Sequence, residues 1–164
     1  GDASVPVGDL LFRLEAAYTW GGRFSPDAAS VAAAWGDLIP VETDRLQMLA
    51  GLDWNPGPWT VTTQYYEDIL PRNPGGVEQD WRKNAATLSV SRGLFRETLK
   101  VSASFYLGLR DFDTVLGAEA AWAVTDALEF SLGIDCFSGG IDDRGDYAAY
   151  EDISCVWLRG VYRF

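Results

Sequence analysis

The chain has 164 residues, 48% of them apolar, which is enough for one folded domain with a substantial core and excludes a disordered chain. It contains no histidine, which excludes histidine-based catalytic triads, metal sites and pH switches. The net charge of −11 disfavours nucleic acid and anionic membrane surfaces as partners, and no apolar run is long enough for a transmembrane helix or a signal peptide.

The first strand is expected at 9–20, after an irregular entry segment at 1–8. Within 9–20 the even-numbered positions are apolar, whereas the odd-numbered set includes Arg13 and Glu15. Alternation with a period of two indicates a β-strand with two unlike faces.

The following connection, 21–43, is the longest in the chain. Its Ser25-Pro26-Asp27 sequence combines a capping hydroxyl, a proline suited to a first turn and an early acid, which together signal the start of a helix. A short helix is therefore expected within 28–38. It could cover the mouth of the fold, but a loop helix facing solvent is the favoured interpretation.

Six more segments show the same alternation and are expected to be strands: 44–54, 59–69, 81–93, 98–110, 114–124 and 127–138. The pattern is clearest at 98–110, where odd-numbered apolar residues alternate with an even-numbered set that includes Lys100. The connections alternate in length as well. Those at 55–58, 94–97 and 125–126 are short, those at 21–43, 71–79 and 139–151 are long, and the short one at 111–113 is the exception.

The last segment, 152–164, contains the eighth expected strand. Its apolar and basic residues alternate, and the segment ends on an aromatic: Val156, Leu158, Tyr162 and Phe164 against Arg159 and Arg163. All eight strands are long enough for the ~9–11 residues of a tilted transmembrane strand. Short turns at one end and long loops at the other are typical of outer-membrane barrels, which would put both chain ends on the periplasmic, short-turn side.

The residues on the two faces favour a membrane barrel over a soluble one. The more polar face is rich in small residues, which suit a narrow interior of eight strands better than a water-facing surface: Ala17, Gly51, Ser102, Ser104, Gly108, Gly117, Ala121, Ser131 and Gly133. Aromatic residues gather near strand ends on the apolar face, where they are expected to form girdles at the lipid headgroups: Trp20, Trp54, Trp59, Tyr65, Trp122, Tyr162 and Phe164.

The same assignment predicts that the charged and amide side chains of the polar face line the lumen: Arg13, Glu15, Arg45, Gln47, Asp53, Gln64, Lys100, Glu119, Glu129, Asp135, Arg159 and Arg163. Because an isolated buried charge is costly, these charges are expected to pair. The expected pairs join the basic residues Arg13, Lys100 and Arg159 to the acids Glu15, Glu119 and Glu129. A salt-bridged plug that fills the barrel is favoured over a polar path for ions or a small solute.

No set of residues indicates catalysis or a metal site. Without histidine the usual routes to an activated nucleophile are closed, and no carboxylate pair stands out, so an enzyme is not expected. The acidic residues of 139–151 lack the EF-hand spacing, which favours a solvated loop over a calcium site. Cys136 and Cys155 fall on opposite faces, which disfavours a simple cross-strand disulfide, although a bulge would permit one.

Three stretches carry a resemblance to a broad class of proteins: E-T-L-K-V-S-A-S-F-Y-L-G-L-R, T-D-A-L-E-F-S-L-G and the terminal V-W-L-R-G-V-Y-R-F. They resemble the C-terminal part of larger porin-like outer-membrane proteins of Gram-negative bacteria, and the resemblance runs from about Leu10 to Phe164. It implies a porin or transport role without catalytic residues, and a C-terminal strand that the barrel-assembly machinery recognises. It also raises the alternative that the chain is a fragment or a minimised version of a larger diffusion porin.

The sequence therefore predicts an all-β fold: a single domain, 1–164, forming an eight-stranded antiparallel up-and-down transmembrane β-barrel in the bacterial outer membrane. The expected function is structural or small-pore, with a polar salt-bridged lumen and no cofactor. The expected partners are outer-membrane lipid, the assembly machinery and small ions or solutes. A soluble ligand-binding β-barrel remains the alternative from another class.

Overall fold

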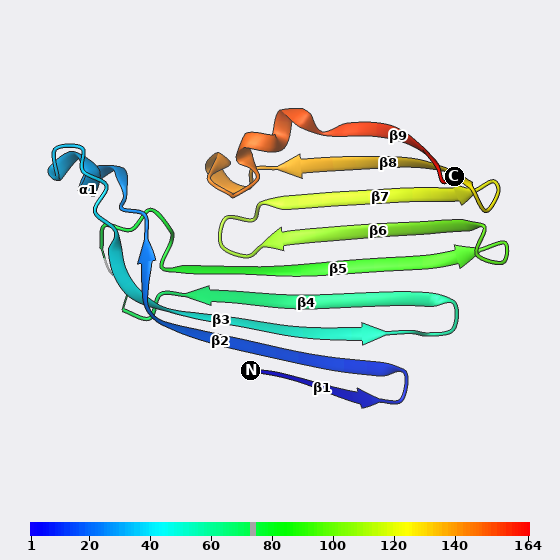
Figure 1. Ribbon diagram of the computed structural model, residues 1–164, viewed down its shortest axis with the longest axis horizontal. Coiled ribbons are helices and arrows are strands. Elements are labelled where there is room, and N and C mark those ends of the chain that lie inside the picture. The colour runs from blue at the N-terminus through cyan, green and yellow to red at the C-terminus, as the bar shows by residue number, and fades with distance from the viewer. Residues whose placement is uncertain (73–74) are drawn as a thin grey trace.

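The computed structural model describes residues 1–72 and 75–164, and its regular structure is dominated by one antiparallel sheet (Figure 1). Each strand pairs with its neighbours in the chain, so the topology is up-and-down. The strands are β1 (Asp2–Val7), β2 (Leu10–Phe24), β3 (Val41–Trp54), β4 (Trp59–Ile69), β5 (Arg82–Leu94), β6 (Leu99–Gly108), β7 (Thr114–Ala123), β8 (Leu128–Ser138) and β9 (Cys155–Tyr162). The predicted all-β, antiparallel up-and-down architecture is confirmed.

The eight expected strands are present as β2 to β9, in the predicted order. β4 has the bounds that alternation predicts, and the other strands differ from their predicted ends by a few residues. Alternation locates these strands well because two unlike faces impose a period of two along the whole strand. It locates their ends less well, because pairing continues for as long as a neighbouring backbone is in reach.

The prediction of an irregular entry at 1–8 is wrong, because these residues form a ninth strand, β1. It pairs antiparallel with β2, with Val5 opposite Phe12, and a tight turn at Gly8, whose φ is +60°, joins the two strands. The segment was too short for its alternation to stand out. Pro6 also argued against a strand, but a proline is tolerated in a strand at the edge of a sheet.

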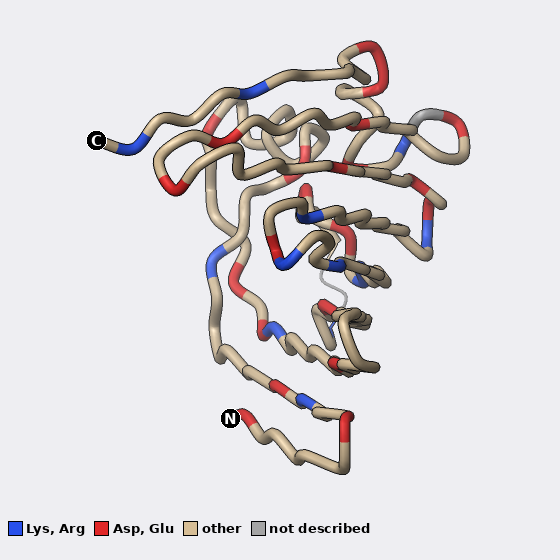
Figure 2. Tube along the Cα trace, turned by 90° about the vertical axis from the view of Figure 1, so that its right-hand side faces the viewer, with Lys and Arg blue, Asp and Glu red and all other residues tan. Residues whose placement is uncertain are grey.

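The prediction of a closed eight-stranded barrel is also wrong, because the sheet has nine strands and is open. β1 occupies the edge of β2 that an eight-stranded barrel would have paired with the last strand. The two edge strands, β1 and β9, do not pair with each other. In Figure 2, which looks along the strands from the end with the short turns, the sheet bends from the N-terminus to the C-terminus without its two edges meeting.

The two ends of the sheet differ, as the lengths of the connections predict. Most tight turns lie at one end, and the long connections, with α1 (Ala28–Ala33), η1 (Ile141–Asp143) and η2 (Ala148–Ile153), lie at the other, together with the short connection 109–113 between β6 and β7 (Figure 1). Helix α1 begins where the sequence predicts, with the Asp27 carboxylate accepting from the backbone N–H of Ser30 at 2.7 Å. It is shorter than the predicted 28–38 because the backbone at Trp35 and Gly36 turns left-handed. Residues 73 and 74, in the predicted loop 71–79, lie outside the described residues.

Strand β2 continues past its predicted end through a bulge. The register with β3 shifts between Thr19 and Gly22, where Gly21 adopts a φ of +58°. Asp44 on β3 stabilises this bulge by accepting from the Gly21 N–H at 3.0 Å and from the Tyr18 hydroxyl at 2.9 Å. Consecutive glycines suggested a strand end, whereas here they permit a bulge.

The fold has almost no enclosed apolar core. Among the residues that the structure describes, the apolar side chains classed as buried are those of Leu70 and Ala85. A chain with 48% apolar residues would ordinarily bury many of them. Here most large apolar side chains project from one face of the sheet, which determines what the sheet can do.

Candidate functional site

Strand register carries the two-faced pattern from strand to strand, so the sheet has one polar and one apolar face. Directly paired residues lie on the same face of a sheet. Ser104 on β6, for example, is opposite Ser89 on β5 and Gly117 on β7, while the adjacent Ala103 is opposite Val90 and Ala118. We call these the polar face and the apolar face.

The predicted lumen-lining residues all belong to the polar face. Eleven are related by register across the strands, Gln64 to Gly51 and Arg13, for instance, and Glu119 to Gly133. Arg163 follows β9 and approaches Glu129 with its guanidinium, at 3.7 Å. The structure brings these side chains together on one face of the sheet. The predicted lumen-lining residues on this face are Arg13, Glu15, Arg45, Gln47, Asp53, Gln64, Lys100, Glu119, Glu129, Asp135, Arg159 and Arg163.

The expected ion pairs form in part. Arg159 binds Glu119 at 2.9 Å, which confirms that pair. Arg13 binds Asp53 at 2.9 Å instead of an expected partner, because the register puts Asp53 diagonally across from it on β3, where Thr62 also donates to the carboxylate. Lys100 makes no ion pair with a described residue. Partner choice thus follows register, which alternation alone does not give.

Two polar-face contacts were missed by sequence reasoning. Asp68, which is nearly buried, accepts from the Arg45 guanidinium at 2.9 Å and also contacts Tyr66. Trp157 lies over Gly133, where no side chain competes for the space, and its indole N–H donates to Asp135 at 2.7 Å. The alternation along β4 and β9 would have assigned both Asp68 and Trp157 to the polar face.

The apolar face is continuous and exposed. Every strand contributes at least one exposed large apolar side chain to it: Val5, Leu14, Met48, Tyr65, Leu88, Phe105, Leu116, Leu132 and Leu158. Leu158 is 75% exposed and Leu132 is 55% exposed. Side chains of this kind are normally removed from water.

Of the aromatic residues expected to form girdles, those with a register partner lie on the apolar face: Trp54, Trp59, Tyr65, Trp122 and Tyr162. Trp54, Trp59, Trp122, Tyr162 and Phe164 lie at the end of the sheet with the short turns, and Trp20 lies towards the end with the long loops. Tyr65 lies between, where its hydroxyl donates to Glu67, which also binds Arg82. Whether these rings meet lipid headgroups stays a prediction.

The polar face is hollowed in two places. A cavity of about 170 Å³ lies over β5 to β9, and its lining is mostly small or hydroxylated, with Glu119 and Asp135 among it. A second hollow, of about 400 Å³, lies over the first strands beside Glu15 and Gln47. Small residues therefore leave space on this face, as their abundance predicts.

Both cysteines are free thiols. Cys155 is opposite Asp135 and so belongs to the polar face, whereas Cys136 is opposite Leu116 on the apolar face. This agrees with the prediction that the two cysteines fall on opposite faces of the sheet.

None of the described helices is long and apolar enough to cross a membrane. No described cluster of three or more His, Cys, Asp or Glu residues is arranged to hold a metal ion. No protein-family model, curated protein or solved structure matches the chain.

Proposed function

We propose that this sheet is part of the wall of a porin-like β-barrel in a bacterial outer membrane. In this arrangement the apolar face contacts lipid hydrocarbon and the polar face lines the lumen. The observation that carries the proposal is the exposed apolar face, which crosses all nine strands, while ion pairs such as Arg13–Asp53 and Arg159–Glu119 lie on the opposite face.

The cost of leaving such a face in water supports lipid as its neighbour. Burying one large apolar side chain is worth about 1.5–3 kcal/mol. Every strand carries at least one such exposed side chain, whereas soluble monomers rarely expose apolar patches beyond a few hundred Å². A soluble barrel would carry this apolar set inside, and the burial of the described residues gives that alternative no support.

The open edges support a barrel that is completed by further strands. In a membrane every backbone N–H and C=O must be paired, so β1 and β9 need partners. After nine antiparallel strands, β1 and β9 run in the same direction, so pairing them directly would create a parallel seam. An odd number of additional strands keeps every pair antiparallel and makes the total even, as in bacterial outer-membrane barrels. This favours the larger diffusion porin over an eight-stranded small pore.

Adjacent cysteine substitutions test which face meets lipid. Ala103→Cys and Ser104→Cys are a matched pair, because both residues are small and exposed and lie in mid-strand on opposite faces of β6. Each is made in a chain whose native cysteines are replaced, with Cys136→Ser and Cys155→Ser. The outer membranes of an expressing Gram-negative cell are then treated with a water-soluble maleimide.

The proposal expects rapid labelling of Ser104→Cys and protection of Ala103→Cys. Solubilising the membranes in denaturant should make the two sites react equally, which serves as the control for intrinsic reactivity. Equal labelling of both sites in intact membranes, or labelling of Ala103→Cys alone, would contradict the proposal.

A lumen plugged by its own charges is the second version of this function, and it would require ion pairs that meet across the lumen. Single-channel conductance across a planar bilayer separates the two versions. Large, reproducible current steps support an open, porin-like lumen. A silent bilayer that contains folded protein supports the plug. In either version the C-terminal strand β9 is the segment that the barrel-assembly machinery would recognise.

A further inference from the structure

One cation on the apolar face of the sheet has no partner in the described part of the chain. Arg92, on β5, is opposite Trp59 on β4 and Val101 on β6, so it belongs to the apolar face. Its guanidinium makes no ion pair with a described residue, and its Nε atom is enclosed without an acceptor. A guanidinium carries five N–H donors, so an unpaired one on an apolar surface calls for an explanation.

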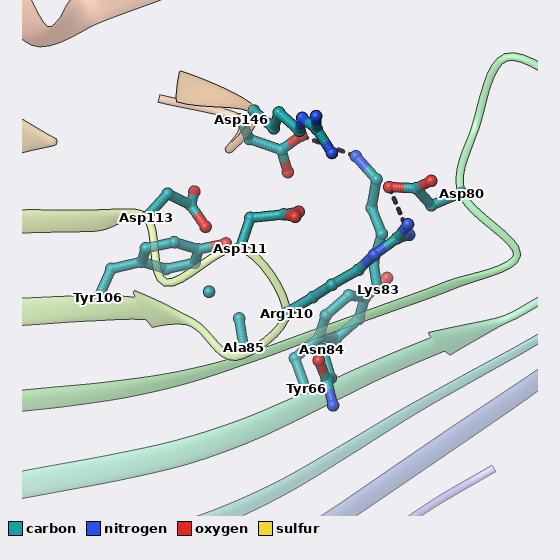
Figure 3. A pocket seen from close by; sticks show the side chains of 12 residues that line it. Tyr66, Asp80, Lys83, Asn84, Ala85, Tyr106, Arg110, Asp111, Asp113 and Asp146 are labelled. Carbon is teal, nitrogen blue, oxygen red and sulfur yellow. Dashed lines mark hydrogen bonds and ion pairs between the residues drawn. The ribbon is translucent and has the colours of Figure 1, made fainter. Parts of the chain in front are cut away.

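Most other cations of the chain are paired. Ten of the thirteen lysines and arginines make an ion pair with a described acid. At the loop end, for example, Lys83 binds Asp146 and Arg110 binds Asp80, as Figure 3 shows. The three cations without a described acid partner all lie towards the turn of one hairpin, that of β5 and β6: Arg92, Arg96 and Lys100. The turn end of this hairpin is therefore a local positive region in a chain whose net charge is −11, because the one acid between them, Glu97, offsets a single charge.

The ring of Trp59 determines where the Arg92 guanidinium lies. The Arg92 Cζ atom is 5.0 Å from the centroid of the Trp59 ring. A guanidinium over an indole ring is attracted through its face, and its N–H edge stays free for a bidentate acceptor. The Arg92 side chain is partly exposed, and neither of its Nη atoms is enclosed as Nε is. These two donors can therefore be reached from outside the protein.

The Arg92–Trp59 pair lies at the level where a membrane would offer phosphate groups. Trp59 is the first residue of β4 and Arg92 is two residues before the end of β5, so both lie at the short-turn end of the sheet. Trp54 and Trp122, two other expected girdle residues, lie at the same end (Figure 1). If the apolar face contacts lipid, this girdle lies among the headgroups. An arginine at that level reaches lipid phosphates, whereas one in the middle of the strand would face hydrocarbon.

We propose that Arg92 and Trp59 form a binding site for the phosphate of an anionic phospholipid headgroup, in the leaflet at the short-turn end of the sheet. The site rests on the proposed contact between the apolar face and lipid. The two Nη atoms of Arg92 donate to two phosphate oxygens, the Trp59 ring holds the guanidinium, and the lipid chains continue along the apolar face. Arg96, which is exposed in the adjoining turn, adds positive charge that favours an anionic over a zwitterionic lipid.

The probe is dioleoylphosphatidylglycerol, added to the full chain folded in an uncharged detergent, with the bound lipid counted by native mass spectrometry. Arg92→Gln should weaken the tightest binding of this lipid by about tenfold, because a charge-assisted, bidentate contact is lost. Arg92→Lys, which keeps the charge without the bidentate geometry, should weaken it less. Trp59→Leu removes the ring that holds the guanidinium and should weaken binding several-fold.

Lys100→Gln is the matched control. It removes the same charge from the same hairpin, but Lys100 lies on the polar face, opposite Ala121, so this variant should bind the lipid like the parent. Unchanged binding by Arg92→Gln would overturn the proposal. Equal weakening by Arg92→Gln and Lys100→Gln would leave only general charge attraction and would overturn it as well.

Competition experiments identify what the site recognises. Dioleoylglycerol has the same chains but no phosphate, so it should not displace phosphatidylglycerol. Displacement by dioleoylglycerol would reduce the site to chain binding, and displacement by inorganic phosphate at equal concentration would make it a site for free phosphate. Either result would contradict a site for a lipid headgroup.

The labelling of Ala103→Cys described above separates this proposal from the proposed function. If that cysteine is protected in membranes but Arg92→Gln binds phosphatidylglycerol like the parent, the lipid site fails and the proposed function stands. If that cysteine is labelled in intact membranes, the proposed function fails, whatever the result at Arg92.

Discussion

Leu132→Arg is the substitution that most directly tests whether the apolar face meets lipid. Leu132 is on β8, 55% exposed, and its register partners on both sides are apolar, Ala120 and Leu158. It lies four residues from Leu128, at the turn end of the strand. At about 3.4 Å per residue and a tilt near 40°, Leu132 is about 10 Å deeper than Leu128, close to the middle of a ~25 Å apolar band.

The depth of residue 132 in the membrane determines how much an arginine there should reduce the free energy of unfolding. An arginine at the middle of a lipid-facing strand costs about 2–4 kcal/mol, or a factor of about 30 to 900 in the folding equilibrium. Leu128→Arg, on the same face of the same strand, should cost at most about 1 kcal/mol because its side chain can reach the interface. If the face met water instead, Leu132→Arg would change the free energy of unfolding by only about 0.5 kcal/mol, as for most surface substitutions.

The assay is urea unfolding of the chain assembled in phospholipid vesicles, followed by tryptophan fluorescence and fitted with a common slope. The decisive quantity is the difference in the free energy of unfolding between Leu128→Arg and Leu132→Arg. Any general effect of arginine on the unfolded chain cancels in this difference. Equal stabilities for Leu128→Arg and Leu132→Arg would refute the assignment of this face to lipid.

Four other outcomes are expected. A double-mutant cycle of Glu119→Ala and Arg159→Ala should give a coupling energy of about 0.2–1 kcal/mol if the pair faces water, and a value of several kcal/mol would favour a packed plug. Arg96→Gly should raise the free energy of unfolding by about 1 kcal/mol, because Arg96 has a φ of +59°; an unchanged urea midpoint would contradict this. Gly133→Ala should cost about 1–3 kcal/mol in the same measurement, since its methyl group would overlap the indole ring above it. Burial raises the pKa of Asp113 in the folded state above the ordinary value of 3.8. Protonation of this carboxyl therefore favours the folded state, and its contribution to stability is fully present below pH 3.8. The contribution is lost as the pH rises through the pKa of the folded state. Asp113→Asn should therefore gain stability over the parent as the pH rises above 3.8, and parallel curves of stability against pH would contradict this.

The strands could be predicted from the sequence because alternation is a local signal. In β6 the odd-numbered apolar residues and the even-numbered polar ones are visible without knowing the neighbours, and the structure keeps that division. The number of strands and the closure could not be predicted in the same way. Both depended on Asp2–Val7, where six residues and a proline give too little pattern, and on which edge of β2 this segment pairs with.

The face of each candidate residue could be predicted, but its partner could not. Parity assigned Arg13 and Arg159 to the polar face, whereas the register between strands decided that Arg13 binds Asp53 and Arg159 binds Glu119. The surroundings of Asp113 could not be predicted either. Asp113 looked like part of a short turn, and its burial comes from glycines in other parts of the chain.

The ion pairs of the polar face bear on the width of any lumen that it lines. A plug requires charges that meet across the barrel, from strands on opposite sides. In the described part of the chain, Arg13–Asp53 and Arg45–Asp68 join adjacent strands, and Arg159–Glu119 spans only from β9 to β7. Each of these six charges is thus neutralised along the wall within one or two strands. Such pairs need no partner across the lumen, so adding the strands that close the barrel would widen the lumen without separating them. The local pairing therefore favours an open, porin-like lumen over a plug.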